Sequence, residues 1–272
     1  MKGVTLSGLC RASGLSRQAY YQGRRVRTAA ARDTAQIIRQ VRRERLMQPR
    51  IGGRKLQALL RAADVRIGRD ALFRLLGERD LLVTPKRKRV RTTYYDQTLP
   101  VYRNRLYDHQ PTRPHEVWVS DVTFIDTNEG FTYLSLVTDL VSRRIVGWNA
   151  GRANTAAECL KALQMAIAQL PADCTPIHHS DRGSQYCCHE YVAALNARGL
   201  PVSMTEQNHC YENCYAERVN GILKDEFNLD WKFRTHREAV AAIAEAVTTY
   251  NTRRPHTSLQ LRTPDHVHQL AA

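Results

Sequence analysis

The sequence predicts an α/β domain with a mixed five-stranded sheet and helices on both faces, preceded by a basic, all-helical region. The chain has 272 residues, of which 43% are hydrophobic, which is enough for a substantial core. Residues 1–110 contain 26 Lys and Arg against 8 Asp and Glu, whereas residues 111–272 contain 15 against 18. A charge excess concentrated in one region favours a polyanionic partner, most often nucleic acid, over an ordinary solvated surface.

The basic region is expected to contain two helix-turn-helix-like units. In the first, at residues 1–30, Leu6, Leu9 and Cys10 form an apolar face, Gly14 interrupts the helix and Ser16 caps the next one. A helix is then expected from Asp33 to Met47. Its apolar side, and that of the following pair of helices at residues 54–63 and 69–76, would consist of Ile37, Ile38, Val41, Leu46, Leu72, Phe73, Leu75 and Leu76. A small helical bundle without DNA contacts would show the same periodicity. The interpretation as a DNA-binding unit is favoured because arginines surround these helices.

Four segments follow from this division. The first two, at residues 1–30 and 31–85, are the helix-turn-helix-like segment and the helical DNA-binding domain. Residues 86–112 read as a basic linker that could follow a phosphate backbone, and residues 113–272 form the α/β domain with a helical extension at its end. The side chains expected to contact DNA in the basic region are Arg54, Lys55, Arg69, Lys86, Arg87, Lys88 and Arg89.

The α/β domain is predicted from Val117 onward, where β-branched residues alternate with polar ones. Three strands joined by short turns indicate an antiparallel meander. Helices and short strands then alternate, which is the element order of a ribonuclease H-like domain. The predicted strands are 117–125, 131–140, 143–151, 175–180 and 200–204, and the predicted helices are 155–170 (capped by Asn154), 185–198, 212–229 and 235–250.

Three carboxylates in this domain are candidate catalytic residues. Asp121 lies within the first strand, Asp181 ends the fourth, and Glu217 lies on the following helix. The first and fourth strands are adjacent in this topology, so the three side chains can converge, and their mutual repulsion calls for divalent cations. Mg²⁺ suits such oxygen ligands, and two ions would support phosphoryl transfer. Spacing alone leaves rival acids open, namely Asp126, Asp139, Glu206, Glu212, Asp225 and Glu226.

The cysteines and the N-terminal sequence indicate in which cellular compartment the protein is expected. The chain has seven cysteines, no run of about 18 apolar residues and no apolar signal-like segment at its start. These features predict a cytoplasmic protein with reduced thiols and no membrane association. His209, Cys210 and Cys214, with His189 nearby, could bind zinc, but their spacing lacks the usual second ligand pair.

Several motifs together resemble a known family. They are W-x-x-D-x-T at 118–123, YLSLVTDLVSRRIVGW at 133–148, HHSDRGSQY at 178–186, SMT at 203–205, ENCYAERVNGILKDEF at 212–227 and YNTRRPHTSL at 250–259. They are similar to the retroviral-integrase-type core of bacterial insertion-sequence transposases, in particular the OrfB product of the IS-three family. An R-x-GGRKL stretch at 50–56 extends the resemblance toward the N-terminus. Ile51 and Glu212 depart from the family pattern, which often has an aromatic residue and Asp there.

The resemblance implies roles for individual residues. Asp121, Asp181 and Glu217 match the catalytic and metal-binding triad, and Lys224 matches a basic residue that faces DNA. His179, Ser180 and Asn213 match positions that shape the site. For the motif formed by Tyr250, Asn251, Arg253, Pro255 and His256, packing and phosphate contacts are the only roles we can suggest.

The function implied is a DNA transposase that cleaves element ends and joins them to target DNA by transesterification. It would use two Mg²⁺, for which Mn²⁺ could substitute, and act as a homodimer or larger on terminal inverted repeats and target DNA in a bacterial nucleoid. The family also implies fusion to, or pairing with, an upstream OrfA-type product, which carries a helix-turn-helix and a leucine zipper. Two alternatives stay open: a DNA-binding repressor of the element without catalysis, and a nuclease of the same fold that cuts without joining.

Overall fold

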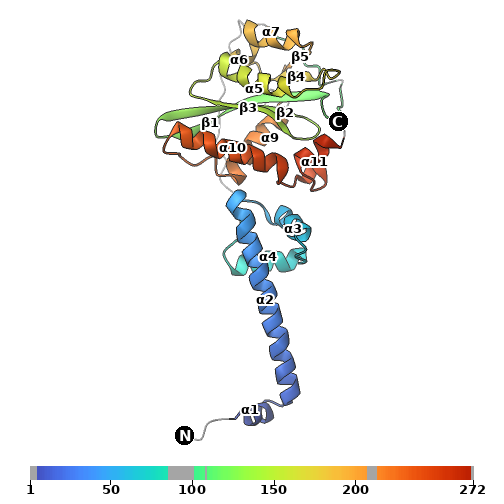
Figure 1. Cartoon of the computed structure of the whole chain (residues 1–272), viewed down its shortest axis with the longest axis vertical. Coiled ribbons are helices and arrows are strands. Elements are labelled where there is room, and N and C mark those ends of the chain that lie inside the picture. Colours follow the sequence, from blue (N-terminus) through green and yellow to red (C-terminus); the bar gives the residue numbers. More distant parts are fainter. Residues whose placement is uncertain (1–4, 85–100, 108, 207–212, 271–272) are drawn as a thin grey trace.

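A computed structural model describes residues 5–84, 101–107, 109–206 and 213–270, and the side chains of 26–32 are not considered. The α/β domain lies at one end of an elongated molecule, and a long helix extends from it toward the N-terminus (Figure 1). Two shorter helices pack beside the part of the long helix nearest to the α/β domain. The basic, helical region therefore precedes the α/β domain as predicted.

Four helices form the N-terminal region: α1 (Leu6–Ala12), α2 (Arg17–Met47), α3 (Gly53–Ala62) and α4 (Arg69–Glu78). The turn at Gly14, with φ of +69°, and the cap at Ser16 occur where the sequence places them. The expected separate helix from Asp33 is wrong, because α2 is continuous for 31 residues and crosses the expected boundary at residue 30. The hydroxyl of Ser16 starts it by accepting a hydrogen bond from the amide of Ala19.

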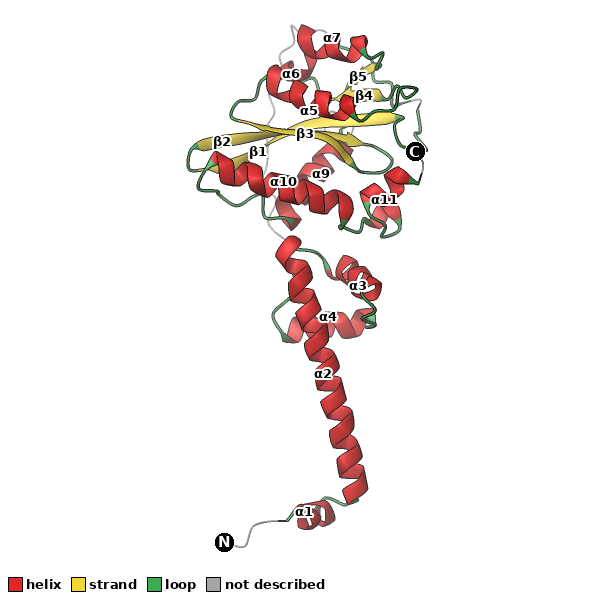
Figure 2. Cartoon of the chain, in the orientation of Figure 1, coloured by secondary structure: helices red, strands yellow, loops and turns green. Residues whose placement is uncertain are grey.

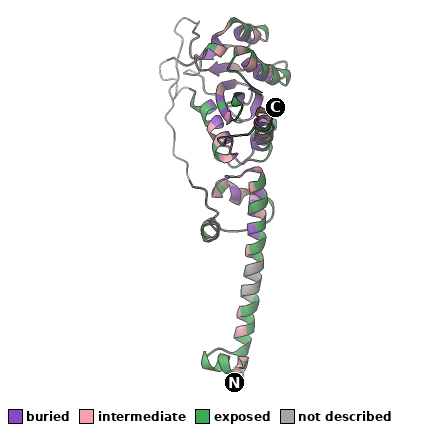
Figure 3. Cartoon of the chain, turned by 90° about the vertical axis from the view of Figure 1, so that its left-hand side faces the viewer, coloured by how far each residue is buried: buried purple, intermediate pink, exposed green. Residues whose placement is uncertain are grey.

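A compact apolar cluster holds the second half of α2 against α3 and α4. Its buried members are Ile37, Val41, Ile51, Leu56, Leu60, Leu72 and Leu76. Leu46 was expected inside but is 82% exposed, and Phe73 is partly exposed beside Gly53. Burial is confined to the end of α2 that carries α3 and α4, whereas the distal half is mostly exposed (Figure 3).

The sheet contains β1 (Val117–Thr127), β2 (Gly130–Asp139), β3 (Ile145–Gly151), β4 (Ile177–Ser180) and β5 (Val202–Met204). Its order is β3-β2-β1-β4-β5. Figure 2 shows the strands, in yellow, between helices, in red. The first three strands are antiparallel, and β4 and β5 join in parallel. The prediction of a mixed, ribonuclease H-like sheet, with its first and fourth strands adjacent, is confirmed.

Helices cover both faces of this sheet (Figure 1). One face carries α5 (Ala156–Ala168), α6 (Ser184–Cys187) and α7 (His189–Ala197), and the other carries α9 (Cys214–Glu226) and α10 (His236–Thr252). A 3₁₀ turn at Thr257–Leu259 and α11 (Pro264–Gln269) complete the chain. Two details differ from the predictions: Thr155 rather than Asn154 caps α5, and an extended Cys188 divides the helix expected at 185–198.

The two faces form separate apolar layers, one around Trp118 and Leu163 and one around Ile125 and Ile243. Because β1 contributes side chains to both layers, its backbone is fixed from both sides. None of the helices in the described residues is long and apolar enough to cross a membrane.

Candidate active site

The candidate site lies where β1 loses its partner on one side. Strand β4 pairs with β1 only from Val117 to Ser120, with Ser120 opposite Ser180. Asp121 and Asp181 each follow the last residue of this pairing, so the parallel register places them side by side. Beyond Ser120, within the described residues, that edge of β1 stays unpaired until Asp126, whose carbonyl accepts a hydrogen bond from the amide of Phe233 at 2.9 Å. The topology thus brings two of the three predicted carboxylates to one point and leaves room beside them.

Asp121 is held by two hydrogen bonds. The amide of Val122 donates to Oδ1 at 2.9 Å, and Nδ2 of Asn220 donates to Oδ2 at 2.8 Å. Burial, together with the charges of Asp181 and Glu217, raises the pKa of Asp121 to about 7 against the opposing effect of the two hydrogen bonds. The charges of both other predicted carboxylates therefore act on Asp121, as expected for acidic side chains that lie close together.

Asp181 begins the loop after β4. Its Oδ1 accepts a hydrogen bond from the amide of Gly183 at 3.0 Å, which closes a tight turn. The neighbouring Arg182 donates to the carbonyls of Thr205 and Glu206, at 2.6 and 2.9 Å, and thereby ties this turn to the chain after β5. The Asp-Arg-Gly sequence is thus a turn, and that turn presents Asp181 beside Asp121.

Glu217 lies in the first turn of α9 and is exposed. The start of this helix is fixed by buried Asn213, whose Nδ2 donates to the carbonyl of Ser120 at 3.2 Å. Asn220, one turn after Glu217, reaches Asp121. The sequence analysis did not single out Asn220. Its position three residues after Glu217 on a helix facing the sheet was the signal that could have found it.

Two of the three residues expected to shape the site, His179 and Ser180, are buried on β4, and the third, Asn213, precedes α9. His179 bonds Ser203 through Nδ1 at 2.8 Å, which links β4 to β5, and the hydroxyl of Ser180 donates to the carbonyl of Asp181 at 3.0 Å. His178 lies in the core, where Nε2 contacts the hydroxyls of Ser120 and Tyr191. Burial lowers the pKa of His178 to about 3, so it stays neutral at physiological pH.

Divalent metal ions fit the donor set at this point. Carboxylate oxygens are the ligands that Mg²⁺ prefers, and a cation would relieve the repulsion that raises the pKa of Asp121. Within the described ranges, no three His, Cys, Asp or Glu side chains are already arranged around one metal position. Asp121 and Asp181 are thus paired by the sheet, while Glu217 depends on the placement of α9.

Three of the rival acids have carboxylates that are engaged elsewhere. Asp139 is buried and accepts hydrogen bonds from the amides of His115, Val141 and Ser142. Glu206 accepts from the amide of Asn104. Glu226 is ion-paired away from the site, and the carbonyl of its neighbour Asp225 accepts from Arg50. Glu212, His209 and Cys210 lie outside the described residues, and the proposed zinc partner Cys214 is exposed.

Lys224 and the other predicted DNA contacts differ in their surroundings. The ammonium of Lys224 lies 4.5 Å from the ring centre of Phe124 on β1, beyond Asp121. Arg54 is exposed, and Arg69 pairs with its neighbour Asp70 on the surface. The expectation for Lys55 needs correction, because its ammonium is engaged by Glu226 of α9 instead of lying on an open surface. Residues 86–89 fall outside the described part of the chain.

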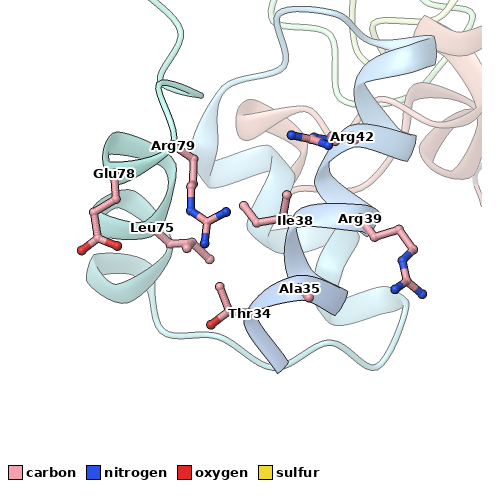
Figure 4. A pocket seen from close by; sticks show the side chains of 8 residues that line it. All are labelled: Thr34, Ala35, Ile38, Arg39, Arg42, Leu75, Glu78 and Arg79. Atoms are coloured by element: carbon pink, nitrogen blue, oxygen red, sulfur yellow. The ribbon is translucent and has the colours of Figure 1, made fainter. Parts of the chain in front are cut away.

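A cavity of about 650 Å³ lies between α2 and α4, away from the carboxylates. Its floor is apolar, from Ile38 and Leu75, and three arginines surround it (Figure 4). Arg79 extends over this floor from α4, whereas Arg39 points away from it. The residues lining the cavity are Thr34, Ala35, Ile38, Arg39, Arg42, Leu75, Glu78 and Arg79. The sequence analysis named none of these arginines.

Comparisons with known proteins agree with this geometry. Two families, both described as integrase core domain, match residues 111–210 and 198–264. A simian T-cell lymphotropic virus intasome, solved by cryo-electron microscopy in complex with a PP2A regulatory subunit, has a similar fold. The TM-score is 0.50 at 17% identity, over 80% of this chain and 70% of that one. Fold and sequence thus define a polynucleotidyl transferase with an integrase-type core.

Three relatives narrow the family. A 31 kDa protein of insertion element IS600 from Shigella sonnei is 34% identical over 97% of this chain and 100% of its own length. The transposase for insertion sequence IS629 from the same species is 30% identical, over 75% of this chain and 68% of its own length. Transposase InsF for insertion sequence IS3A from Escherichia coli is 34% identical, over 65% of this chain and 62% of its own length. The chain belongs to the IS3 family of insertion-sequence transposases, which confirms the resemblance stated above.

Proposed function

We propose that the chain catalyses Mg²⁺-dependent cleavage of insertion-sequence ends and strand transfer of those ends into target DNA, with Asp121, Asp181 and Glu217 as its catalytic residues. The observation that supports this is that the register of β1 and β4 places Asp121 beside Asp181, while Asn213 and Asn220 bind α9, which carries Glu217, to β1 at the same point. Family membership supports the reaction class, since the IS629 relative carries the name transposase.

The chain's own residues would divide the work as follows. Asp121 and Asp181 would hold the metal ions from the sheet, and Glu217 would complete the ligand set from α9. Bound Mg²⁺ would supply Lewis-acid stabilisation for an in-line displacement at phosphorus. Asn220 orients Asp121, and Asn213 fixes the start of α9 beside it. Lys224 and the exposed arginines of the helical region would bind DNA phosphates, and a homodimer or larger assembly would hold two ends.

An assay with a labelled element-end duplex and a target plasmid tests this proposal. Asp181→Asn and Glu217→Gln keep the side-chain shape but lose the charge, so each is expected to abolish both nicking and joining in Mg²⁺. Asp126→Asn on β1 is the matched control and should retain both. Retained nicking by either triad variant would refute the assignment. If the wild-type protein nicks the duplex but gives no joined products, it is a nuclease. If it binds DNA without nicking it, it is a repressor.

A further inference from the structure

The C-terminus of α9 is held by residues of the helical N-terminal region. The amide of Arg50 donates to the carbonyl of Glu226 at 3.0 Å, and its Nε donates to the carbonyl of Asp225 at 3.0 Å. The last carbonyls of a helix lack partners within the helix, and a cation there also stabilises the helix dipole. Arg50 thus caps, from another domain, the helix that carries Glu217.

Side chains at the same place form a buried ionic cluster. The Glu226 carboxylate accepts from the Lys55 ammonium and, through two hydrogen bonds of 2.9 and 2.8 Å, from the Arg254 guanidinium. Arg254 is only 2% exposed. Although burial by itself would raise the pKa of Glu226, the two cations outweigh burial and lower it, so the carboxylate is charged at neutral pH.

A second ion pair crosses between the same domains. Arg253, at the end of α10, donates to Glu44 of α2 at 3.0 Å, and Glu44 is 3% exposed. Arg253 and Arg254 both belong to the motif at 250–259 for which the sequence suggested only packing or phosphate contacts. In the structure both guanidinium groups bind carboxylates, so this part of the motif contributes to the contact between the helical region and the α/β domain.

The two ends of α9 therefore touch different partners. At its start, Asn213 binds the carbonyl of Ser120 on β1, and in its middle Asn220 binds Asp121. At its end, 13 residues and about 20 Å away, lie Arg50 and Lys55 of the helical region. A shift of the helical region would thus move α9 as a rod and change where Glu217 stands relative to Asp121.

We propose that Glu44, Arg50, Lys55, Glu226, Arg253 and Arg254 form an interdomain junction that positions α9, and with it Glu217, according to the placement of the DNA-binding helical region. These are positioning residues: none of them contacts the carboxylates of the site. The proposal rests on the proposed function for its catalytic consequence, but the mechanical link stands on contacts alone.

The test uses the full chain with Lys55→Met, which removes the charge but keeps the chain length, and Lys55→Arg, which restores the charge. Lys161→Met is the matched control, because Lys161 forms a surface pair with Glu158 inside the α/β domain. Hydrogen exchange of the protein without DNA is measured for α9 and, as a check of folding, for β1 and β2. Glu44→Gln breaks the second pair in case Lys55→Met does not fold.

We expect the last turn of α9 to exchange at least tenfold faster in Lys55→Met and Glu44→Gln, with β1 and β2 unchanged. Lys55→Arg should stay within about threefold of the wild type, and Lys161→Met should match it. The joining rate on bound DNA should fall at least tenfold in Lys55→Met while affinity for DNA is retained. The proposal would be overturned if hydrogen exchange in α9 were unchanged in the variants. It would also be overturned if Lys55→Met lowered the affinity for DNA and left the joining rate on bound DNA unchanged. A wild-type protein that joins no DNA would refute the proposed function but not the junction, because the hydrogen-exchange measurement on α9 tests the junction without any DNA joining.

Discussion

Replacing Asp121 by Asn is expected to stabilise the metal-free protein while abolishing its activity. Burial and the neighbouring carboxylates raise the pKa of Asp121 from 3.8 to about 7. One pKa unit corresponds to about 1.4 kcal/mol, so ionised Asp121 costs the folded state at most about 4 kcal/mol above pH 7. Asn carries no charge and escapes this cost.

The gain is reduced by one hydrogen bond. Asp121 accepts from both Val122 and Asn220, whereas Asn offers only one acceptor oxygen to these two donors. An unpaired donor in a partly buried site costs about 1–3 kcal/mol. The net stabilisation expected at pH 8 is therefore about 1–3 kcal/mol.

The pH dependence gives the sign of the effect. An acid with a raised pKa binds its proton more tightly in the folded state, so the free energy of unfolding falls as pH rises from 3.8 to about 7. The difference between variant and wild type should thus be largest at pH 8, smaller by about 3 kcal/mol at pH 5 and least below pH 4. Urea denaturation without divalent cations measures it, and Asp126→Asn is the control. Addition of Mg²⁺ should stabilise the wild type more than the variant. A variant no more stable than the wild type at pH 8, or a difference independent of pH, would refute the reasoning.

Two further predictions concern the helix and the sheet around the site. Asn220→Ala removes a hydrogen bond that lowers the pKa of Asp121, so the rising limb of the pH–rate profile for DNA joining should move to higher pH; an unshifted limb would show that Asn220 does not act on Asp121. Gly147→Ala should destabilise the protein by about 1–3 kcal/mol, since its Cβ would lie 2.1 Å from the carbonyl oxygen of Ala162 on α5. Gly221→Ala on α9 is its control, because no atom lies within 4 Å of the added carbon and helix propensity favours Ala by about 1 kcal/mol. Equal urea midpoints for these two variants would contradict the packing of α5 on β3.

Local signals in the sequence were sufficient for most elements. Alternation from Val117 predicted β1, and the cap at Ser16 and the turn at Gly14 occur as expected. Two predictions failed, the first for a local reason and the second because packing decides. The helix from Asp33 begins at Arg17 instead, because nothing in the backbone pattern between the two interrupts a helix. Leu46 matches the apolar period but finds no partner in the packed cluster and is exposed.

The adjacency of the strands that carry the candidate acids was predictable from the sequence, but the residues that support those acids were not. Asp121 lies on β1 and Asp181 follows β4, and these strands are neighbours as expected. The catalytic role of Asp121, Asp181 and Glu217 stays a prediction. Asn220 was missed because an amide on a helix has no distinctive pattern until the strand it faces is known. Lys55 was misassigned for the same reason: in a run of basic residues, only tertiary structure shows which cation has a carboxylate beside it.

The sequence by itself thus determined the fold and, through the resemblance of its motifs, the family, because periodicity and motif spacing are properties of the chain; the catalytic role of the three acids stays a prediction. Tertiary structure alone decided the state of those groups. Burial and nearby charges raise the pKa of Asp121, and two arginines of the C-terminal motif form ion pairs with Glu44 and Glu226. Electrostatic energies depend on distance and burial, and both are set by residues far apart in sequence.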